Sequence, residues 1–253
     1  MTIDSELDTR VLPALDLSRL RGFLDERMPG LVRGALVARL ITGGRSNLTF
    51  DVTDGYSRWV LRRPPLGYVS ATAHDMGREF RVMGALAGSA VPVPVVQCAD
   101  SEVLGAPFYL MSKERGKTYR YARQLISLGG ERTREISERL VDALVDVHAV
   151  DYVAVGLGDF GRPRGYLARQ VERWRLQWDA STLRDVPGMG ELHRRLEDAV
   201  PAESAATIVH GDFRLDNLLF GGQDRVGAVV GFERIGVLSE PLVDAGLAAF
   251  EEV

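Results

Sequence analysis

The stretch IVHGDFRLDNLLF, residues 208–220, places a histidine, two aspartates, an arginine and an asparagine between two apolar ends. Asp212 and Asn217 are five residues apart in a loop that leads into a strand, so a carboxylate and an amide oxygen can converge on one point. Phosphoryl transfer needs such a pair: a carboxylate to orient an attacking hydroxyl and accept its proton, and an oxygen ligand for Mg²⁺. We expect His210 to hold the loop by hydrogen bonding rather than to act as an acid or base.

The whole chain has 253 residues, 45% of them apolar and 26% charged, which is typical of a soluble globular protein with one large or two smaller domains. The net charge of −4 favours neither nucleic acid nor an anionic membrane as a partner. The acidic N-terminus does not resemble a signal peptide, and no apolar run approaches the ~20 residues that span a bilayer. We therefore expect a cytoplasmic protein. The lone Cys98 excludes an internal disulfide, and the four scattered histidines lack zinc-site spacing.

The N-terminal part predicts an α+β unit. Leu17, Leu20, Leu24 and Met28 recur at helical spacing, and Gly30 is placed to stop that helix. Residues 36–62 read as three antiparallel strands with turns at Gly43-Gly44 and at Asp54-Gly55. A helix over 74–88 and a strand that ends near Ser112 follow.

The second part of the chain is mainly helical from residue 131 onward. Leu167, Val171, Trp174 and Trp178 form one apolar helix face, which we expect to be core rather than a ligand cage. After the 208–220 stretch, VGAVVGF (226–232) reads as a short strand. The change in composition at 112–117 predicts a boundary between two domains, residues 1–112 and residues 113–253.

The pattern His-x-Asp-x-x-x-x-Asn resembles the catalytic loop of aminoglycoside phosphotransferases and choline kinases, and, in altered order, of protein kinases. The resemblance is closest to the actinobacterial branch related to kinase domains joined to acyl-CoA dehydrogenases. It extends from about residue 36 to 250 and includes GGRSNLTF, VLRRPPLG, REFRVMGALAGSAVPVPV, GAPFYLM and GLGDFGRPRGYLARQVERWRLQW. It implies a bilobal protein-kinase-like α+β fold that uses ATP and Mg²⁺. In this fold, residues 1–112 would form a nucleotide-binding lobe with an antiparallel sheet, and residues 113–253 a mainly helical lobe with the catalytic loop.

The resemblance also implies roles for single residues. Asp212 would orient the acceptor hydroxyl, and Asn217 would be a Mg²⁺ ligand. Arg62 would grip the α- and β-phosphates and pair with Glu79, an arrangement that suits a bidentate guanidinium. The remaining implied nucleotide contacts are a hairpin over the phosphates and a hinge at the adenine edge: Gly43, Gly44, Ser46 and Asn47 in the hairpin, and Met111 and Lys113 in the hinge.

Gly231 departs from the family pattern. Family members commonly have LDWE where this chain has VGFE (230–233), and the aspartate of LDWE is the principal Mg²⁺ ligand. Glu233 is not an obvious replacement, because residues i and i+2 of an extended strand lie ~6–7 Å apart. Losing one preorganised group that stabilises charge typically costs about 10²- to 10³-fold in rate. A second departure is that family members usually continue for several helices beyond the equivalent of Asp244, whereas this chain stops nine residues later, at Val253.

Two hypotheses follow. In the first, the protein is an ATP- and Mg²⁺-dependent phosphotransferase for a hydroxyl of a small molecule. In the second, it is a catalytically impaired kinase-like module that binds a nucleotide or another ligand. Sugars, amino alcohols, hydroxylated acyl thioesters and natural-product hydroxyls are all compatible acceptors. Either the chain is a truncated form, or something else closes the side that the absent helices would cover, for example a second copy in a homodimer.

Overall fold

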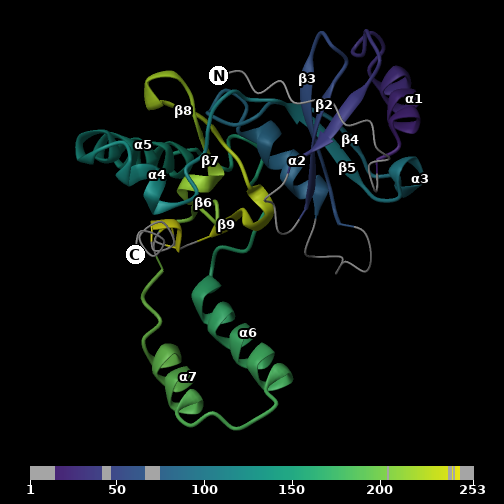
Figure 1. Cartoon of the computed structure of the whole chain (residues 1–253). Helices are drawn as coiled ribbons and strands as arrows, with labels where there is room; N and C mark the ends of the chain where they lie inside the picture. Colours follow the sequence, from purple (N-terminus) through teal and green to yellow (C-terminus); the bar gives the residue numbers. More distant parts are fainter. Residues whose placement is uncertain are drawn as a thin grey trace. The chain divides into compact units, whose positions relative to one another are not determined.

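The computed structural model describes residues 15–41, 47–65, 75–203, 205–238, 241 and 243–245. Figure 1 shows the helices and strands of the chain, which divides into two compact units. Unit 1 comprises residues 1–118 and 218–233, and unit 2 comprises residues 119–217 and 234–253. The domain division at residues 112 and 113 stays a prediction.

Unit 1 is built on a five-stranded sheet with the order β1-β2-β3-β5-β4, in which all neighbours are antiparallel. Its strands are β1 (Val37–Leu40), β2 (Leu48–Thr53), β3 (Arg58–Arg63), β4 (Pro94–Cys98) and β5 (Phe108–Ser112). The predicted Asp54-Gly55 hairpin joins β2 and β3: Gly55 has φ +86°, and Asp54 Oδ1 accepts hydrogen bonds from the backbone N–H of Tyr56 and Ser57.

The two faces of this sheet have different partners. Helix α1 (Leu17–Arg27) begins at Asp16, which caps it by accepting from the N–H of Ser18 and Arg19. Its Leu20 and Leu24 join a core cluster with Phe50, Leu61, Phe108 and Leu110, and α3 (Ser101–Leu104) packs beside α1. Because alternate residues of a strand face opposite sides, Arg62 and Tyr109 point to the other face, where α2 (Met76–Ala85) contributes the buried Glu79.

Residues 218–233 add a hairpin to unit 1. Strands β7 (Leu218–Phe220) and β8 (Val226–Val229) pair with each other, and Phe220 exchanges two backbone hydrogen bonds with Lys117. The 3₁₀ turn η2 (Gly222–Asp224) lies between these strands. The prediction of a strand over 226–232 is wrong at its end. β8 stops at Val229, Gly231 has φ +87°, and Phe232–Arg234 forms the 3₁₀ turn η3. A left-handed residue cannot continue a strand, so the backbone turns at Gly231.

Unit 2 holds the helices α4 (Ala122–Ile126), α5 (Gly130–His148), α6 (Tyr166–Ser181) and α7 (Met189–Asp198). The strands β6 (Thr207–Val209) and β9 (Gly236–Leu238) pair in antiparallel fashion. The 3₁₀ turn η1 (Leu215–Asn217) lies within the 208–220 stretch, directly before β7. α5 buries Ile136, Leu140 and Leu144, as its periodicity predicts. Within the described residues, no helix is both long and apolar enough to cross a membrane.

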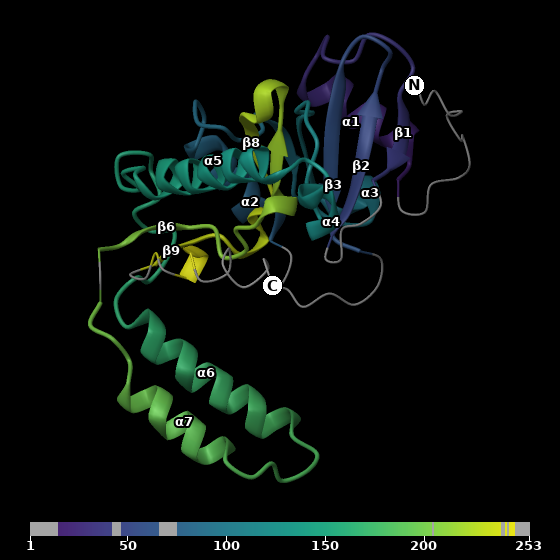
Figure 2. The same ribbon diagram turned by 60° about the vertical axis from the view of Figure 1, so that its left-hand side comes forward.

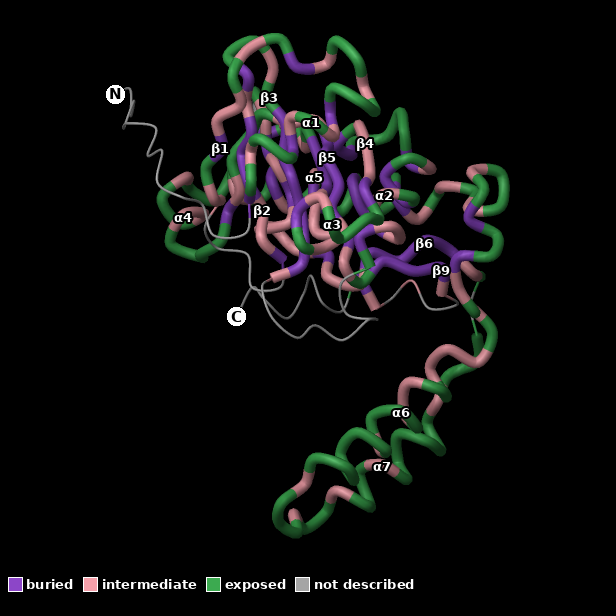
Figure 3. Tube along the Cα trace, turned by 90° about the vertical axis from the view of Figure 1, so that its right-hand side faces the viewer, coloured by how far each residue is buried: buried purple, intermediate pink, exposed green. Residues whose placement is uncertain are grey.

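The expectation that Trp174 and Trp178 are core residues is wrong. Both lie on α6, which forms as predicted, but their exposed fractions are 59% and 37%. α6 and α7 lie side by side as a hairpin in Figures 1 and 2, and neither helix has a buried residue, as Figure 3 shows. Two helices that pack mainly on each other enclose too little volume to bury an indole ring.

Candidate active site

The loop after β6 is held by Asp244 from a distant part of unit 2. Asp244 Oδ2 accepts a hydrogen bond from the backbone N–H of His210, and Oδ1 accepts one from Gly211, both at 2.7 Å. His148 Nε2 lies 3.0 Å from Asp244 Oδ2. Asp244 is fully buried, so these contacts are shielded from water. The sequence pattern indicated that Asp244 belongs to a family segment, but not that it binds this loop.

Glycine is required at position 211. Its φ is +78°, and a Cβ there would lie 2.8 Å from the backbone oxygen of Arg234. The next residue is positioned by His210, whose Nδ1 accepts a hydrogen bond from the Asp212 N–H at 3.3 Å. The His210 ring is buried and packs edge-on against Phe213. His210 therefore has the contacts of a residue that shapes the loop.

Asp212 and Asn217 meet, as their spacing predicts. Asn217 Nδ2 donates to Asp212 Oδ2 at 3.1 Å and to the Asp212 backbone oxygen at 2.8 Å. η1 brings the two residues together by turning the chain between them. The Asp212 side chain is 35% exposed, so its carboxylate is accessible to a small molecule. With Nδ2 directed at Asp212, the amide oxygen of Asn217 is the atom available as a ligand.

In unit 1, Arg62 pairs with Glu79 as predicted. Arg62 Nη1 lies 3.1 Å from Glu79 Oε2, and both residues are buried. Glu79 also accepts hydrogen bonds from the Tyr109 hydroxyl at 2.7 Å and from Asn47 Nδ2 at 3.3 Å. Burial raises the pKa of Glu79, and Arg62 opposes this shift. Burial alone would lower the pKa of Arg62, but Tyr109, Glu79 and Glu233 outweigh it and raise that pKa.

Glu233 is the residue whose role sequence reasoning missed. Its Oε1 contacts Arg62 Nη2, so the guanidinium lies between two carboxylates. The expected spacing of an extended strand does not apply, because Glu233 belongs to the turn η3. Arg62 and Glu233 are 171 residues apart in the chain, and no local pattern connects them. Arg62 Nε remains a buried donor without a hydrogen-bond partner among the described residues.

The other residues implied as nucleotide contacts have mixed outcomes. Met111 lies on β5, is buried and pairs in register with Val60 of β3. Lys113 Nζ contacts Asp51 Oδ2, so its side chain is engaged within unit 1. The Asn47 amide is directed at Glu79. Gly43, Gly44 and Ser46 lie outside the described residues.

The described residues hold no group of three or more acidic, histidine or cysteine side chains that could bind a metal ion. Among the described residues of unit 2, the Asp212 carboxylate and the Asn217 amide lie side by side and could each supply a ligand oxygen. Mg²⁺ is often held by one or two carboxylates together with phosphate oxygens and water. This donor set therefore fits Mg²⁺ only in combination with the phosphates of a nucleotide, and Gly231 adds no side-chain donor.

Residues 37–251 match a family model described as "Phosphotransferase enzyme family". Acyl-CoA dehydrogenase family member 11 of Gallus gallus is 35% identical over 240 residues, which cover 92% of this chain and 30% of that protein. The probable acyl-CoA dehydrogenase IBR3 of Arabidopsis thaliana is 36% identical over 226 residues, 83% of this chain and 27% of that protein. The chain thus spans about a third or less of these curated relatives.

Solved structures agree with this match. A proposed aminoglycoside phosphotransferase of Ralstonia eutropha has 34% identity and a TM-score of 0.79, and the match covers 93% of this chain and 69% of that one. An aminoglycoside phosphotransferase in a ternary complex with streptomycin and ATP has 18% identity and a TM-score of 0.63, over 91% of this chain and 74% of that one; it shares the fold alone. The predicted family resemblance and the α+β protein-kinase-like fold are confirmed.

Proposed function

We propose, from the premise that this chain belongs to the phosphotransferase enzyme family, that it transfers a phosphoryl group from ATP to a hydroxyl of a small molecule. The observation that carries this proposal is the Asp212–Asn217 pair, with 3.1 Å between Asn217 Nδ2 and Asp212 Oδ2. It lies in a loop whose backbone is held by a buried carboxylate, Asp244. A preorganised carboxylate and amide at this spacing suit in-line transfer, where positioning and charge stabilisation do most of the chemistry.

Asp212 and Asn217 would have distinct roles in unit 2. Asp212 would accept a hydrogen bond from the acceptor hydroxyl and take its proton as the bond from that oxygen to the γ-phosphorus forms and the bond from phosphorus to the departing ADP breaks. Asn217 Oδ1 would help to hold Mg²⁺, which when bound neutralises charge on the phosphates. The hydrogen bond from Asn217 Nδ2 keeps the Asp212 carboxylate in one orientation, which limits the loss of entropy on reaching the reactive geometry.

In unit 1, Arg62 would bind phosphate oxygens of the nucleotide. Its buried, unpartnered Nε is a donor that a phosphate can satisfy. Glu79 fixes the guanidinium from one side, and Tyr109 and Asn47 in turn fix Glu79. Glu233 competes with phosphate for Arg62 Nη2, so nucleotide binding would require displacing or sharing this carboxylate.

A second function is favoured by two specific observations. Position 231 has no carboxylate, and Arg62 is held by two carboxylates in unit 1. The first feature removes a metal ligand from the family pattern, and the second engages the guanidinium that would bind phosphate. The alternative is therefore a module that binds a nucleotide or another ligand with slow or no turnover.

Thermal unfolding with ATP, with and without Mg²⁺, tests these functions. Ligand that binds only the folded protein stabilises it by about 2.7 kcal/mol at a concentration 100 times its Kd. A rise in Tm with ATP that grows when Mg²⁺ is added supports the phosphotransferase. An equal rise with and without Mg²⁺ supports the binding module. If millimolar ATP does not raise Tm, with or without Mg²⁺, the protein is neither an ATP-dependent phosphotransferase nor a module that binds ATP.

A further inference from the structure

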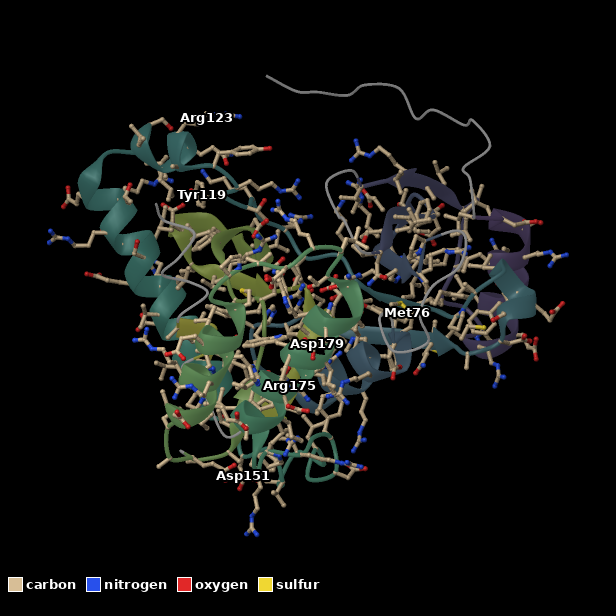
Figure 4. The ribbon with its side chains drawn as sticks, turned by 90° about the horizontal axis from the view of Figure 1, so that it is seen from below. Met76, Tyr119, Arg123, Asp151, Arg175 and Asp179 are labelled. Carbon is tan, nitrogen blue, oxygen red and sulfur yellow. The ribbon has the colours of Figure 1, made fainter. Side chains whose placement is uncertain are left out.

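Unit 2 contains a cavity of about 590 Å³ beside the 208–220 stretch. Its walls come from the segment before α4, from α4 itself, from the start and middle of α5, and from residues 214–216. Figure 4 labels Tyr119 of this wall and the neighbouring Arg123. The apolar part of the wall has six larger side chains: Tyr119, Tyr121, Leu125, Ile126, Leu140 and Leu215.

This cavity lies one side chain away from the proposed catalytic carboxylate. Arg214 lines the cavity, and its Nε is 3.5 Å from Asp212 Oδ1. The same Nε is 2.8 Å from Asp216 Oδ1, and Asp216 also lines the cavity. A molecule whose body rests on the apolar wall would therefore lie against Arg214, the residue through which the cavity adjoins Asp212.

The charges of the wall argue against a polycation. Its one acid, Asp216, already pairs with Arg214. Its other charged residue is the cation Arg120, and Arg123 adds a further cation next to the cavity, 4.3 Å above the ring of Tyr121. A polyamine would meet net positive charge and no acid without a partner, whereas an anion would be attracted.

We propose that this cavity binds the acceptor, and that the acceptor is an alcohol with an apolar body and a single anionic group. The role of the ligand as phosphoryl acceptor rests on the proposed phosphotransferase function, whereas the binding of the ligand to this cavity does not depend on it. The body of the ligand would cover the apolar wall and gain from the burial of apolar surface. The anionic group would lie toward Arg120, and the hydroxyl toward Asp212.

Binding of matched probes to the full chain, measured by isothermal titration calorimetry without nucleotide, tests the proposal. The probes are 10-hydroxydecanoate, which is anionic, 10-aminodecan-1-ol, which is cationic with the same chain, and the polycation kanamycin. We expect 10-hydroxydecanoate to bind at least about tenfold more tightly than either cation, a ratio that one favourable charge contact can supply.

Two variants locate the site. Ile126→Glu puts a carboxylate into the cavity wall, and Val141→Glu makes the same change on α5 outside it. Ile126 is 78% exposed and Val141 54%, so both variants should fold. We expect Ile126→Glu to weaken 10-hydroxydecanoate binding about tenfold or more, through charge repulsion and loss of apolar contact, and Val141→Glu to leave it unchanged.

The proposal is overturned if 10-hydroxydecanoate does not bind at millimolar concentration, if either cation binds as tightly, or if both variants behave alike. Its failure is distinguishable from failure of the proposed function. Probe binding with the expected pattern, but no phosphoryl transfer from ATP under any condition, would leave the cavity as a ligand site and reject the enzyme. Transfer to hydroxyl compounds that Ile126→Glu does not affect would keep the enzyme and reject this cavity.

Discussion

At the residue scale, Asp244 has the clearest structural role, because its two carboxylate oxygens satisfy two successive backbone N–H groups of the loop. Asp244→Asn replaces one acceptor oxygen with an NH₂ group that faces a donor. We expect a loss of about 1–3 kcal/mol in the free energy of unfolding, the cost of an unsatisfied buried donor. Urea unfolding measures this loss. Asp198→Asn, on the exposed surface of α7, is the control. Equal stability of Asp244→Asn and wild type would contradict this role.

The lowered pKa of Asp54 leads us to expect that the stability of the fold depends on pH. Burial alone would raise its pKa, but hydrogen bonds from the backbone N–H groups of Arg33, Ser57 and Tyr56 lower it from the ordinary 3.8 to about 2. Because the folded pKa lies below the unfolded one, the carboxylate stabilises the fold above pH 3.8, and this contribution is lost as pH falls toward 2.

The test compares wild type with Asp54→Asn by urea unfolding at several pH values. The difference in unfolding free energy should be constant between pH 5 and 7 and should shrink below pH 3.8. A difference that does not change with pH would show that the ionised form of Asp54 has no special stability in the fold.

Residue spacing predicted the contacts that are close in sequence or shared with the family, and missed those that are neither. The Asp212–Asn217 contact follows from five residues of loop, and the Arg62–Glu79 pair from the family resemblance. The contact of Glu233 with Arg62 depends on a left-handed turn at Gly231 and on the packing of two distant segments. Neither the turn nor the packing leaves a periodic signal in the sequence.

At the scale of elements, hydrophobic periodicity predicted which segments are helices but not what covers their faces. α5 and α6 both carry apolar stripes, yet α5 buries its stripe and α6 does not. An i, i+4 pattern states that a face is apolar, and only the tertiary structure supplies its partner. The end of β8 was unpredictable for a related reason: an apolar run ending in glycine has the same appearance in a strand and in a strand followed by a turn.

Because the apolar face of α6 is exposed, we expect its side chains to contribute little to the stability of the fold. Trp174→Ala should change the free energy of unfolding by less than about 1 kcal/mol, because the indole is already 59% exposed. Leu144→Ala, at a buried position of α5, should cost about 2–5 kcal/mol. Chemical denaturation of the two variants side by side provides the comparison. A loss of several kcal/mol at Trp174 would mean that its ring is packed in solution.

At the scale of the whole molecule, the chain has the family fold, and the sequence resemblance predicts that one family residue, at position 231, is replaced. The match to the phosphotransferase family spans residues 37–251, and the loop with Asp212 and Asn217 is preorganised by Asp244. From the sequence resemblance, we predict that Gly231 stands where the family places its principal metal ligand. Its φ of +87° lies in the left-handed region, where every L side chain is strained and aspartate less than most residues, so Gly231→Asp should fold with some loss of stability.

The most direct test of the central claim, that Asp212 and Asn217 form a phosphoryl-transfer site, is the rate of Mg²⁺-dependent ATP hydrolysis by wild type, Asp212→Asn and Gly231→Asp. Gly231→Asp should accelerate hydrolysis by about 10²- to 10³-fold, the value of one restored charge-stabilising group. Asp212→Asn, introduced alone and together with Gly231→Asp, should reduce it by a similar factor while Tm stays unchanged. Hydrolysis that is indifferent to both substitutions would contradict the account.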